Sequence, residues 1–370
     1  MPPEALPPEA LPSEADGRPH ALVLMVNWRQ ADVTLLALEG VMRLQGARIT
    51  AVVCDNGSAD GSIEALLDWA CGARTAPNDA PAAIGGLAEP ALPKPLPAIL
   101  LDRTQAEAGA GARDAALVVI DTGANLGFAG GNNVGLAYAL ARGDVDYVWL
   151  LNNDTLVAPD AVQQLVAAME ADPGIGICGA TLRYFEAPGI VQCLGGCAFD
   201  DRFASARHLG QGTPADRPID ADAVRRRLDY VMGASMFVRR RFVEEVGPLD
   251  ERFFLYFEEI SWARRAGDRF RLGYAPEAVV YHRSGASTGL ADRRASYGGF
   301  GELMLFKNRI AFTRLYQPRF LPTVYLGLLL VLGKAVLLGR WRRVRTFLQP
   351  ELWRGRPGLA DLKCRSGFHE

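Results

Sequence analysis

The chain has 370 residues, a formal net charge of −2 and a composition of 49% hydrophobic and 22% charged residues. These values are typical of a globular protein with a sizeable core, built as one large domain or two smaller ones. The near-neutral charge gives no reason to expect nucleic acid as a partner.

The cysteines and the N-terminal segment indicate the cellular compartment. The six cysteines are scattered and form no CxxC pair, and a reduced, cytoplasmic compartment is the simplest account. Cys193 and Cys197 lie four residues apart without a nearby His pair, so zinc binding is the weaker alternative. Residues 1–19 repeat the unit PPEAL and show no apolar signal-peptide core. We therefore expect a disordered Pro/Glu-rich tail and no secretion signal.

The next part of the chain alternates apolar runs with helical patterns. Residues 21–28 and 49–54 read as buried strands, and each is followed by a polar turn and an apolar period typical of a helix. Two successive units of this kind predict a parallel sheet with right-handed crossovers. The fold class predicted from the pattern is therefore α/β.

Residues 72–115 are rich in Ala, Pro and Gly and lack sustained periodicity. We expect a surface insertion that is mostly disordered, with one short strand near residues 99–101. A third strand at 116–120 then leads into the glycine-rich stretch 125–133, before a helix. Glycines let a backbone approach a ligand closely, and a helix N-terminus offers free N–H groups to anions. The stretch matches neither the dinucleotide fingerprint nor the P-loop, and a plain glycine turn stays an alternative.

The fourth strand, 146–151, ends in Asn152, Asn153 and Asp154. In open α/β sheets, ligands bind beyond the carboxyl ends of the strands. A cluster of oxygen ligands that includes a carboxylate suits a hard divalent cation that also holds phosphates. The alternative is an Asn/Asp-rich turn that caps the following helix.

Two adjacent carboxylates, Glu258 and Glu259, follow an aromatic stretch and open a helix. They are either an acidic pair stabilised by the helix dipole or the site of a general base, whose pKa rises when aromatic walls exclude water. Upstream, the strand-like run 230–238 carries Gly233 at its middle, and a glycine inside a strand often marks the close approach of a ligand.

Four histidines are present, and we place His20 and His369 in terminal tails. His208 and His282 are then the candidate site residues. A lone histidine is more often structural than a ligand.

Residues 320–339 are the most apolar stretch of the chain. Pro and Gly interrupt it, and its uninterrupted part is shorter than the roughly 20 residues of a spanning helix. A basic cluster follows directly, and an apolar helix beside such a cluster suits the anionic cytoplasmic leaflet of a membrane. Packing on the catalytic domain or in a dimer interface, and true spanning, are the alternatives. The basic cluster consists of Arg340, Arg342, Arg343 and Arg345.

The order of these pieces resembles the family 2 glycosyltransferases of the GT-A fold, and within them the bacterial rhamnosyltransferases of cell-surface polysaccharide assembly. The resemblance covers about residues 20–316, including KNRIAF at 307–312. It implies a Rossmann-like, nucleotide-sugar-binding domain with a mostly parallel central sheet, followed by a C-terminal helical extension at 317–370. The motifs are, in order, VNW, CDNGSADGS, NLGFAGGNN, LLNNDT, GASMFV, LDERFFLYFEEISW and YHRSG.

The resemblance implies an inverting, metal-dependent transfer of a sugar to a hydroxyl of a lipid-linked or cell-surface glycan, with L-rhamnose from dTDP-rhamnose as the first candidate. The enzyme would act in the cytoplasm, on the inner face of the cytoplasmic membrane. Asp154 and His282 fall on the family's metal positions, for Mg²⁺ or Mn²⁺. Glu258 and Glu259 fall on its acidic pair, with Glu259 as the base. The nucleotide-sugar positions fall on Val26, Asn27, Trp28, Asp55, Asn125, Gly130, Asn132 and Asn153.

This sequence departs from the family pattern at three points. Glu259 stands where the family most often has Asp, and Ser261 stands where a further Asp is common. Asp154 is the single carboxylate of the metal motif, so we expect the metal to arrive with the donor's diphosphate.

Three alternatives follow. The donor could carry another nucleotide, UDP or GDP. A nucleotidyltransferase would need a Gly-rich, basic signature after the first strand, which is absent. A degenerate transferase could serve as a scaffold, as the residues at positions 259 and 261 suggest.

Overall fold

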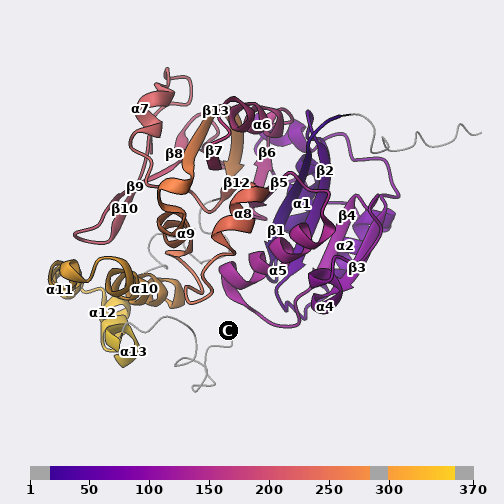
Figure 1. Cartoon of the computed structure of the whole chain (residues 1–370). Coiled ribbons are helices and arrows are strands. Elements are labelled where there is room, and N and C mark those ends of the chain that lie inside the picture. The colour runs from indigo at the N-terminus through magenta and orange to yellow at the C-terminus, as the bar shows by residue number, and fades with distance from the viewer. Residues whose placement is uncertain (1–16, 284–298, 355–370) are drawn as a thin grey trace, which may run out of the picture.

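The computed structural model describes residues 17–283 and 299–354. Most of the expected disordered tail lies outside these ranges, as do Ser284 and Gly285 of the YHRSG motif, His369 and the last part of the C-terminal extension. Within the described ranges, the chain forms a large central sheet, a small second sheet and a group of C-terminal helices (Figure 1).

The first half of the central sheet is parallel, with strand order β3-β4-β2-β1-β5. This arrangement confirms the parallel sheet predicted from the repeated strand–turn–helix pattern. All five carboxyl ends lie along one edge, because neighbouring parallel strands run in the same direction. The strands are β1 (His20–Asn27), β2 (Arg48–Asp55), β3 (Ala98–Asp102), β4 (Leu117–Asp121) and β5 (Tyr147–Leu151).

The second half of the sheet is mixed. Its order beyond β5 is β12-β7-β13-β6, with β8 paired to β7, and only β7 and β13 run parallel. A separate three-stranded antiparallel sheet has the order β10-β9-β11. The strands of the second half are β6 (Thr155–Val157), β7 (Ile175–Tyr184), β8 (Val191–Leu194), β12 (Ser235–Arg239) and β13 (Arg271–His282); those of the small sheet are β9 (Gly196–Asp200), β10 (Ser205–His208) and β11 (Tyr230–Val231).

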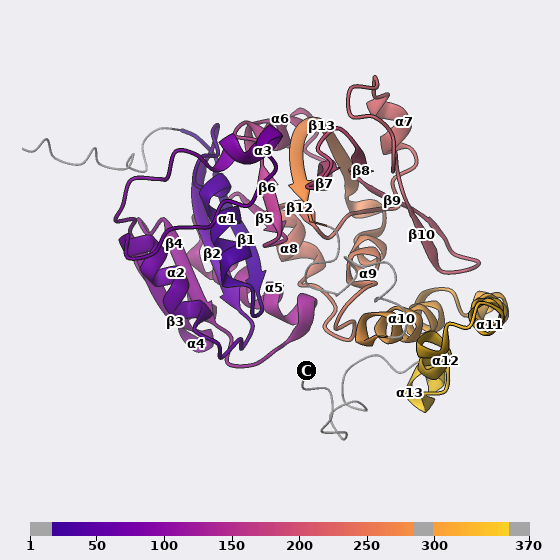
Figure 2. The same cartoon turned by 180° about the vertical axis from the view of Figure 1, so that it is seen from behind.

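Helices cover both faces of the central sheet, as Figures 1 and 2 show. Successive strand residues point to opposite faces, so Val23 joins one core cluster and Leu24 the other. Burial on both faces explains why β1 and β5 read as continuous apolar runs. One face carries α1 (Ala31–Val41), α2 (Ser62–Cys71) and α6 (Ala161–Ala171), and the other carries α5 (Gly127–Arg142), α8 (Arg240–Val246) and α9 (Glu258–Ala266).

The disorder expected for residues 72–115 is not found. β3 extends the sheet by pairing with β4, which confirms the short strand expected near 99–101. The segment also contains the short helices α3 (Ala82–Gly85) and α4 (Arg103–Glu107). Lys94 Nζ lies 3.1 Å from the centroid of the Trp69 ring. These contacts come from residues distant in the sequence, so local composition did not reveal them.

His20 is the first residue of β1 and is buried, so its placement in a tail was wrong. Its ring nitrogens lie 2.9 Å from Thr50 Oγ1 and 2.8 Å from the Asp144 carbonyl oxygen. This histidine therefore has a structural role at the edge opposite the strand carboxyl ends.

The C-terminal helices pack around a third core cluster. Helix α11 is continuous although Pro and Gly occur in it, because Pro322 falls in the first turn, where its missing N–H costs no hydrogen bond. The span 318–337 is long and apolar enough to cross a membrane by length and composition alone, so the expectation that the run is too short was wrong. These helices are α10 (Phe300–Tyr316), α11 (Leu321–Leu337), α12 (Trp341–Phe347) and α13 (Pro350–Arg354).

Candidate active site

A chain of hydrogen bonds links the carboxyl ends of β1, β2 and β5. Asn27 Nδ2 donates to Asp55 Oδ2 at 2.7 Å, and Asn27 Oδ1 accepts from Thr34 Oγ1 at 2.8 Å. Asn153 Nδ2 donates in turn to Thr34 Oγ1 at 2.9 Å. Three of the expected nucleotide-sugar residues, Asn27, Asp55 and Asn153, thus belong to one buried polar network.

Asp55 also closes the turn after β2. Its carboxylate accepts from the backbone N–H of Ser58 at 2.9 Å and from the Ser58 hydroxyl at 2.7 Å. With the bond from Asn27, three of its roughly four acceptor positions are used within the protein. One acceptor position is therefore left for a ligand such as a nucleotide base.

The glycine-rich stretch differs from the expected turn. Helix α5 begins at Gly127, so Gly130 and Asn132 lie inside its first turns. Asn132 is buried, and its amide donates to the Phe128 carbonyl oxygen at 2.9 Å. A Cβ at position 130 would lie 2.7 Å from Leu126 Cβ. Both residues therefore have a structural role in this structure: Asn132 binds the helix backbone, and Gly130 leaves room for the Leu126 side chain.

The other expected nucleotide residues lie around this helix start. Asn125 Oδ1 accepts from the backbone N–H of Gly127 at 3.0 Å and from Asn56 Nδ2 at 3.1 Å. Val26 packs against α5, where a Cβ at position 131 would come within 3.0 Å of it. Trp28 is 43% exposed and is the one large apolar side chain among the expected nucleotide residues that solvent can reach.

A cavity of about 400 Å³ lies beyond Asn152 at the end of β5, and it brings the expected metal and acidic residues together. It receives side chains from the central sheet, the small sheet, α9 and α10. The expected nucleotide residues lie outside its lining. The lining side chains that the following argument uses are Asn152, Asp154, His282, Glu258, Glu259, Gln192, His208, Tyr230 and Arg309.

Asp154 and His282 face each other in this cavity. His282 Nε2 lies 3.3 Å from Asp154 Oδ1, which is buried and has no hydrogen bond among the described residues. His282 Nδ1 lies 2.9 Å from Gln192 Oε1. An amide oxygen can only accept, so Nδ1 carries a hydrogen, and in the neutral ring Nε2 is then the nitrogen with the lone pair.

This geometry fits a divalent cation. A ligating histidine usually donates its other ring N–H to a fixed acceptor, which here is Gln192. The described residues contain no group of three or more His, Cys, Asp and Glu side chains placed to hold a metal ion. A cation on Asp154 and His282 therefore needs further oxygens from a bound substrate. Cys193 and Cys197, the zinc alternative, belong to no such group among the described residues either.

The two glutamates open α9 as expected, and burial acts on both. Glu258 is 2% exposed, and burial together with the charge of Glu259 raises its pKa well above the usual range. Burial also raises the pKa of Glu259, to about 7. At neutral pH, Glu258 is therefore protonated, whereas Glu259 exists in both forms and can accept a proton.

Gly233 is the position where the chain approaches Glu259. A Cβ at this glycine would lie 2.3 Å from Glu259 Oε1. The strand predicted over 230–238 is split here into β11 and β12. The close approach inferred from a glycine within a strand is present, but it is made by a side chain of the protein.

The backbone entering α9 is strained. Tyr256 and Phe257 both have positive φ, 66° and 77°, a conformation that side chains with a Cβ rarely adopt. Asn308 on α10 holds this turn, because its amide donates to the carbonyl oxygens of Leu255 at 2.8 Å and Tyr256 at 3.2 Å. Such strain is often found at functional sites.

A row of side chains from the small sheet lies close to Glu259. Cys197 on β9 is the direct cross-strand partner of His208 on β10 and of Tyr230 on β11, so the three share one face. A hydrogen bond with Cys193, and then the contact with His208, lowers the pKa of Cys197 to about 5. The charge of Cys197 raises the pKa of Glu259, and the charge of His208 lowers it.

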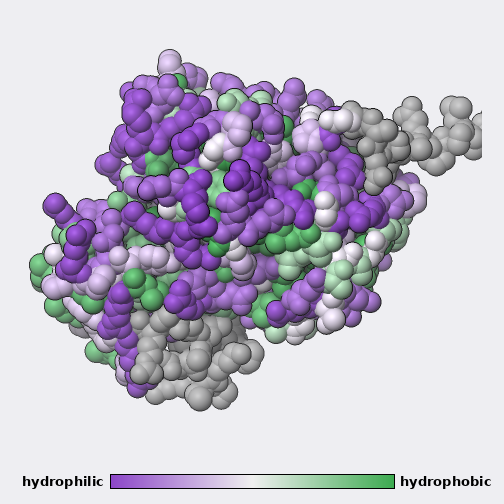
Figure 3. Space-filling view, viewed as in Figure 1, coloured by the Kyte–Doolittle hydropathy of each residue, from purple (hydrophilic) through white to green (hydrophobic). Residues whose placement is uncertain are grey.

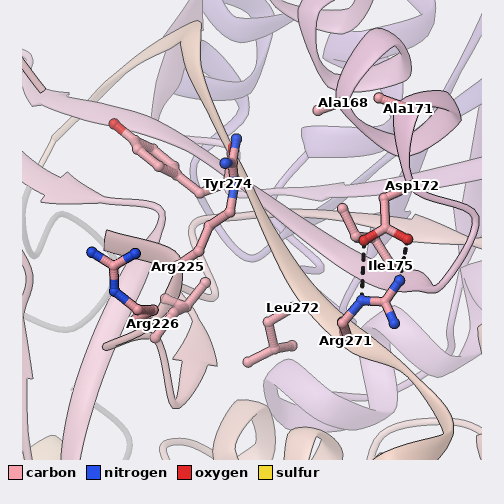
Figure 4. Close-up of a pocket in the computed structure, with 10 residues that line it drawn as sticks. Ala168, Ala171, Asp172, Ile175, Arg225, Arg226, Arg271, Leu272 and Tyr274 are labelled. Atoms are coloured by element: carbon pink, nitrogen blue, oxygen red, sulfur yellow. Dashed lines mark hydrogen bonds and ion pairs between the residues drawn. The ribbon is translucent and has the colours of Figure 1, made fainter. Parts of the chain in front are cut away.

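A second cavity, of about 520 Å³, lies at the opposite edge of the sheet, near the starts of β7 and β13 (Figure 4). Two of the three arginines that line it already have acidic partners. Arg271 Nε donates to Asp172 at 3.0 Å, and Arg225 Nη1 donates to Asp222 at 2.6 Å. This cavity brings together none of the expected site residues.

Sequence reasoning did not assign roles to Gln192, Asn308 and Arg309. Asn308 and Arg309 lie in the KNRIAF segment, which offered a signal. Gln192 lies in residues 181–228, which mix short apolar runs, Gly pairs and charge and predict no site residue. Its role depends on the pairing of β8 with β7, which brings it beside His282.

The chain is similar to several glycosyltransferases. The relatives include an N-acetylglucosaminyl-diphospho-decaprenol L-rhamnosyltransferase of Mycobacterium tuberculosis, 28% identical over 193 residues. Another is the low-salt glycan biosynthesis hexosyltransferase Agl10 of Haloferax volcanii, 26% identical over 147 residues. The matches cover 46% and 40% of this chain, and 60% and 45% of the relatives' own lengths. Among solved structures, the chain is similar to a mannosyltransferase of Pyrobaculum calidifontis in complex with GDP-Man and Mn²⁺. The TM-score is 0.45 and the sequence identity is 17%. The match covers 92% of this chain and 86% of the mannosyltransferase chain.

Two family models match the chain. Glycosyl transferase family 2 matches residues 99–192, and glycosyl transferase family group 2 matches residues 147–350, more than half of the chain. Both matches include the LLNNDT strand end, and the longer one includes the acidic pair. The α/β architecture with its mostly parallel central sheet and C-terminal helices is the one expected from the resemblance. The chain is a glycosyltransferase and belongs to family 2.

Proposed function

We propose that this enzyme is an inverting, divalent-metal-dependent glycosyltransferase that moves a hexose from a nucleotide sugar to a hydroxyl of a lipid-linked or cell-surface glycan. The observation that carries the proposal is the cavity in which the Asp154–His282 pair and Glu259 face the same space. L-Rhamnose from dTDP-rhamnose is the first candidate donor. Its support is the name of the Mycobacterium tuberculosis relative, of which the chain matches 60%.

In this proposal the nucleotide binds along the strand ends at Val26, Asn27, Trp28 and Asp55. Asp154 and His282 would hold Mg²⁺ or Mn²⁺, whose charge would stabilise the leaving nucleoside diphosphate. Gln192 fixes the ring of His282 so that Nε2 points its lone pair at the ligand site.

Glu259 acts as the general base. It takes the proton of the acceptor hydroxyl as that oxygen attacks the anomeric carbon from the face opposite the leaving group, which inverts the configuration. Its raised pKa makes the transfer favourable near neutral pH, and the burial that raises this pKa also keeps bulk water from competing as an acceptor. The strained turn and Asn308 hold the carboxylate in position.

A donor panel tests the proposal. We expect purified protein with Mn²⁺ to release nucleoside diphosphate from dTDP-rhamnose slowly in the absence of acceptor, and faster than from UDP- or GDP-linked hexoses. Mass spectrometry of the released sugar and a coupled assay of the nucleoside diphosphate measure this. Faster release from a UDP- or GDP-sugar would reassign the donor. If no nucleoside diphosphate binds in the presence of Mn²⁺, the chain is a scaffold.

We further propose that the C-terminal helices dock on the anionic inner face of the cytoplasmic membrane. One stripe of α11, formed by Val324, Leu328 and Ala335, packs on the protein. Much of the remaining helix surface is apolar and open, with Leu330 65% and Leu337 87% exposed. Figure 3 shows hydrophobic surface at the lower left, where these helices lie. Arg342 and Arg345 on the neighbouring α12 are exposed, and their charge complements acidic lipids.

Charge placed on the open face should abolish this docking. We expect Leu330→Glu together with Leu337→Glu to lose co-sedimentation with vesicles containing phosphatidylglycerol, because two carboxylates cannot enter the apolar layer. Replacing Arg342 and Arg345 with Gln should weaken binding and remove its salt dependence. Unchanged sedimentation of the double Glu variant would exclude this face as the membrane contact.

A further inference from the structure

Arg309 is a half-buried cation without an acidic partner in the described part of the chain. It lies on α10 and lines the cavity that holds Glu259 and the Asp154–His282 pair. Its Nε is buried and has no hydrogen-bond partner there. Burial lowers the pKa of Arg309, and no neighbouring carboxylate raises it. Its guanidinium carbon lies 5.9 Å from the centroid of the Phe306 ring.

An uncompensated guanidinium in a cavity wall is costly to the folded protein. A charge that is removed from water destabilises the fold unless a partner replaces the water. Among the described residues, none of the carboxyls of this cavity, Glu258, Glu259 or Asp154, affects the pKa of Arg309, so none of them replaces the water. A substrate anion that enters the cavity would supply the missing partner.

The chemistry of the side chain indicates which anion. Guanidinium is planar and donates through a fixed fork that matches two oxygens of a phosphate. We propose that Arg309 binds a phosphate of a substrate in this cavity. The inference rests on the proposed function, which brings a diphosphate to the cavity either on the nucleotide-sugar donor or on a lipid-linked acceptor.

The position of Arg309 links such a phosphate to the base. The preceding residue, Asn308, holds the strained turn that leads into Glu258 and Glu259. The same helix continues through a short turn into α11, whose open face is apolar. A phosphate held at Arg309 therefore lies on the helix that supports the catalytic carboxylate and precedes the proposed membrane surface.

Two titrations distinguish the sources of the phosphate. In the first, dTDP is titrated into the protein with Mn²⁺, and in the second, farnesyl diphosphate is titrated into protein saturated with dTDP and Mn²⁺. We expect Arg309→Met to weaken one of the two affinities by about 10- to 100-fold, the scale of a lost charge-assisted hydrogen bond. Loss in the first titration assigns Arg309 to the donor, and loss in the second assigns it to the acceptor.

Two further variants control the experiment. Arg319→Gln removes a cation from the exposed turn after α10 and should leave both affinities unchanged. Arg309→Lys keeps the charge without the fork and should recover part of the affinity. Arg309→Met should not lower the melting temperature, since an apolar side chain replaces a half-buried charge that has no acidic partner among the described residues. If wild type binds both ligands and neither affinity changes in Arg309→Met, Arg309 does not bind phosphate. If wild type binds no nucleoside diphosphate, the proposed function itself fails.

Discussion

Glu259→Gln is expected to lower turnover by about 10²-fold or more, the scale of a lost general base. Gln keeps the size of the side chain but cannot take the proton of the acceptor hydroxyl. In wild type, kcat/KM should fall as the pH drops below about 7, because burial raises the pKa of Glu259 to about 7 and only the ionised form accepts a proton. The variant should lose this dependence. Steady-state kinetics between pH 5.5 and 8.5 would measure both effects.

The adjacent glutamate is the matched control. Glu258 is already protonated at neutral pH because of its burial and the charge of Glu259, and Gln resembles that neutral form. Glu258→Gln should therefore retain most of the activity and the acidic limb of the pH profile. If Glu258→Gln lost activity while Glu259→Gln stayed active, the two roles would have to be exchanged. Affinity for dTDP with Mn²⁺ should be unchanged in both variants.

Asp154→Ala should abolish metal-dependent binding of the donor. Asp154 supplies the single carboxylate of the site, and its Oδ1 has no hydrogen bond among the described residues. Loss of a residue that only orients a metal ligand typically costs 10- to 100-fold, so loss of this ligand should cost about 10²-fold or more. Calorimetric titration of dTDP with and without Mn²⁺ would measure the change.

Asp160→Ala gives the comparison for that experiment. Asp160 is exposed and lies six residues further along the chain, outside the cavity lining. The substitution removes the same charge as Asp154→Ala. The affinity of this variant for dTDP should equal that of wild type. Metal-dependent dTDP binding that persisted in Asp154→Ala would remove Asp154 from the metal site.

The sequence predicted the sheet and singled out Asp154, His282, Glu258 and Glu259, which the structure brings into one cavity, because each of these follows a local rule. Buried strands appear as apolar runs, and the residues directly after them, such as Asp154, lie along one edge of the sheet. Glu259 was found because it follows an aromatic stretch and opens a helix. These signals need no knowledge of distant contacts.

The parts that sequence reasoning missed depend on tertiary packing. The glycines after position 127 suggested a ligand-binding turn, but they permit a helix to approach β1 closely, and a Cβ at Gly135 would lie 2.2 Å from Leu24. Gln192 lies beside His282 because β8 pairs with β7, and this pairing cannot be predicted from the residues around Gln192. Arg309 lies in the KNRIAF segment, but its place in the wall of the cavity depends on the packing of α10 against the rest of the chain.

The buried glutamate pair gives activity and stability opposite dependences on pH. Both carboxyls have raised pKa values in the folded protein, so from about pH 4.5 upwards the native state holds more protons than the unfolded chain. Their contribution to the free energy of unfolding therefore decreases as the pH rises through this range. Ionisation of Glu259 increases over the upper part of the same range. The enzyme thus reaches its active protonation state under conditions where these two residues stabilise the fold least.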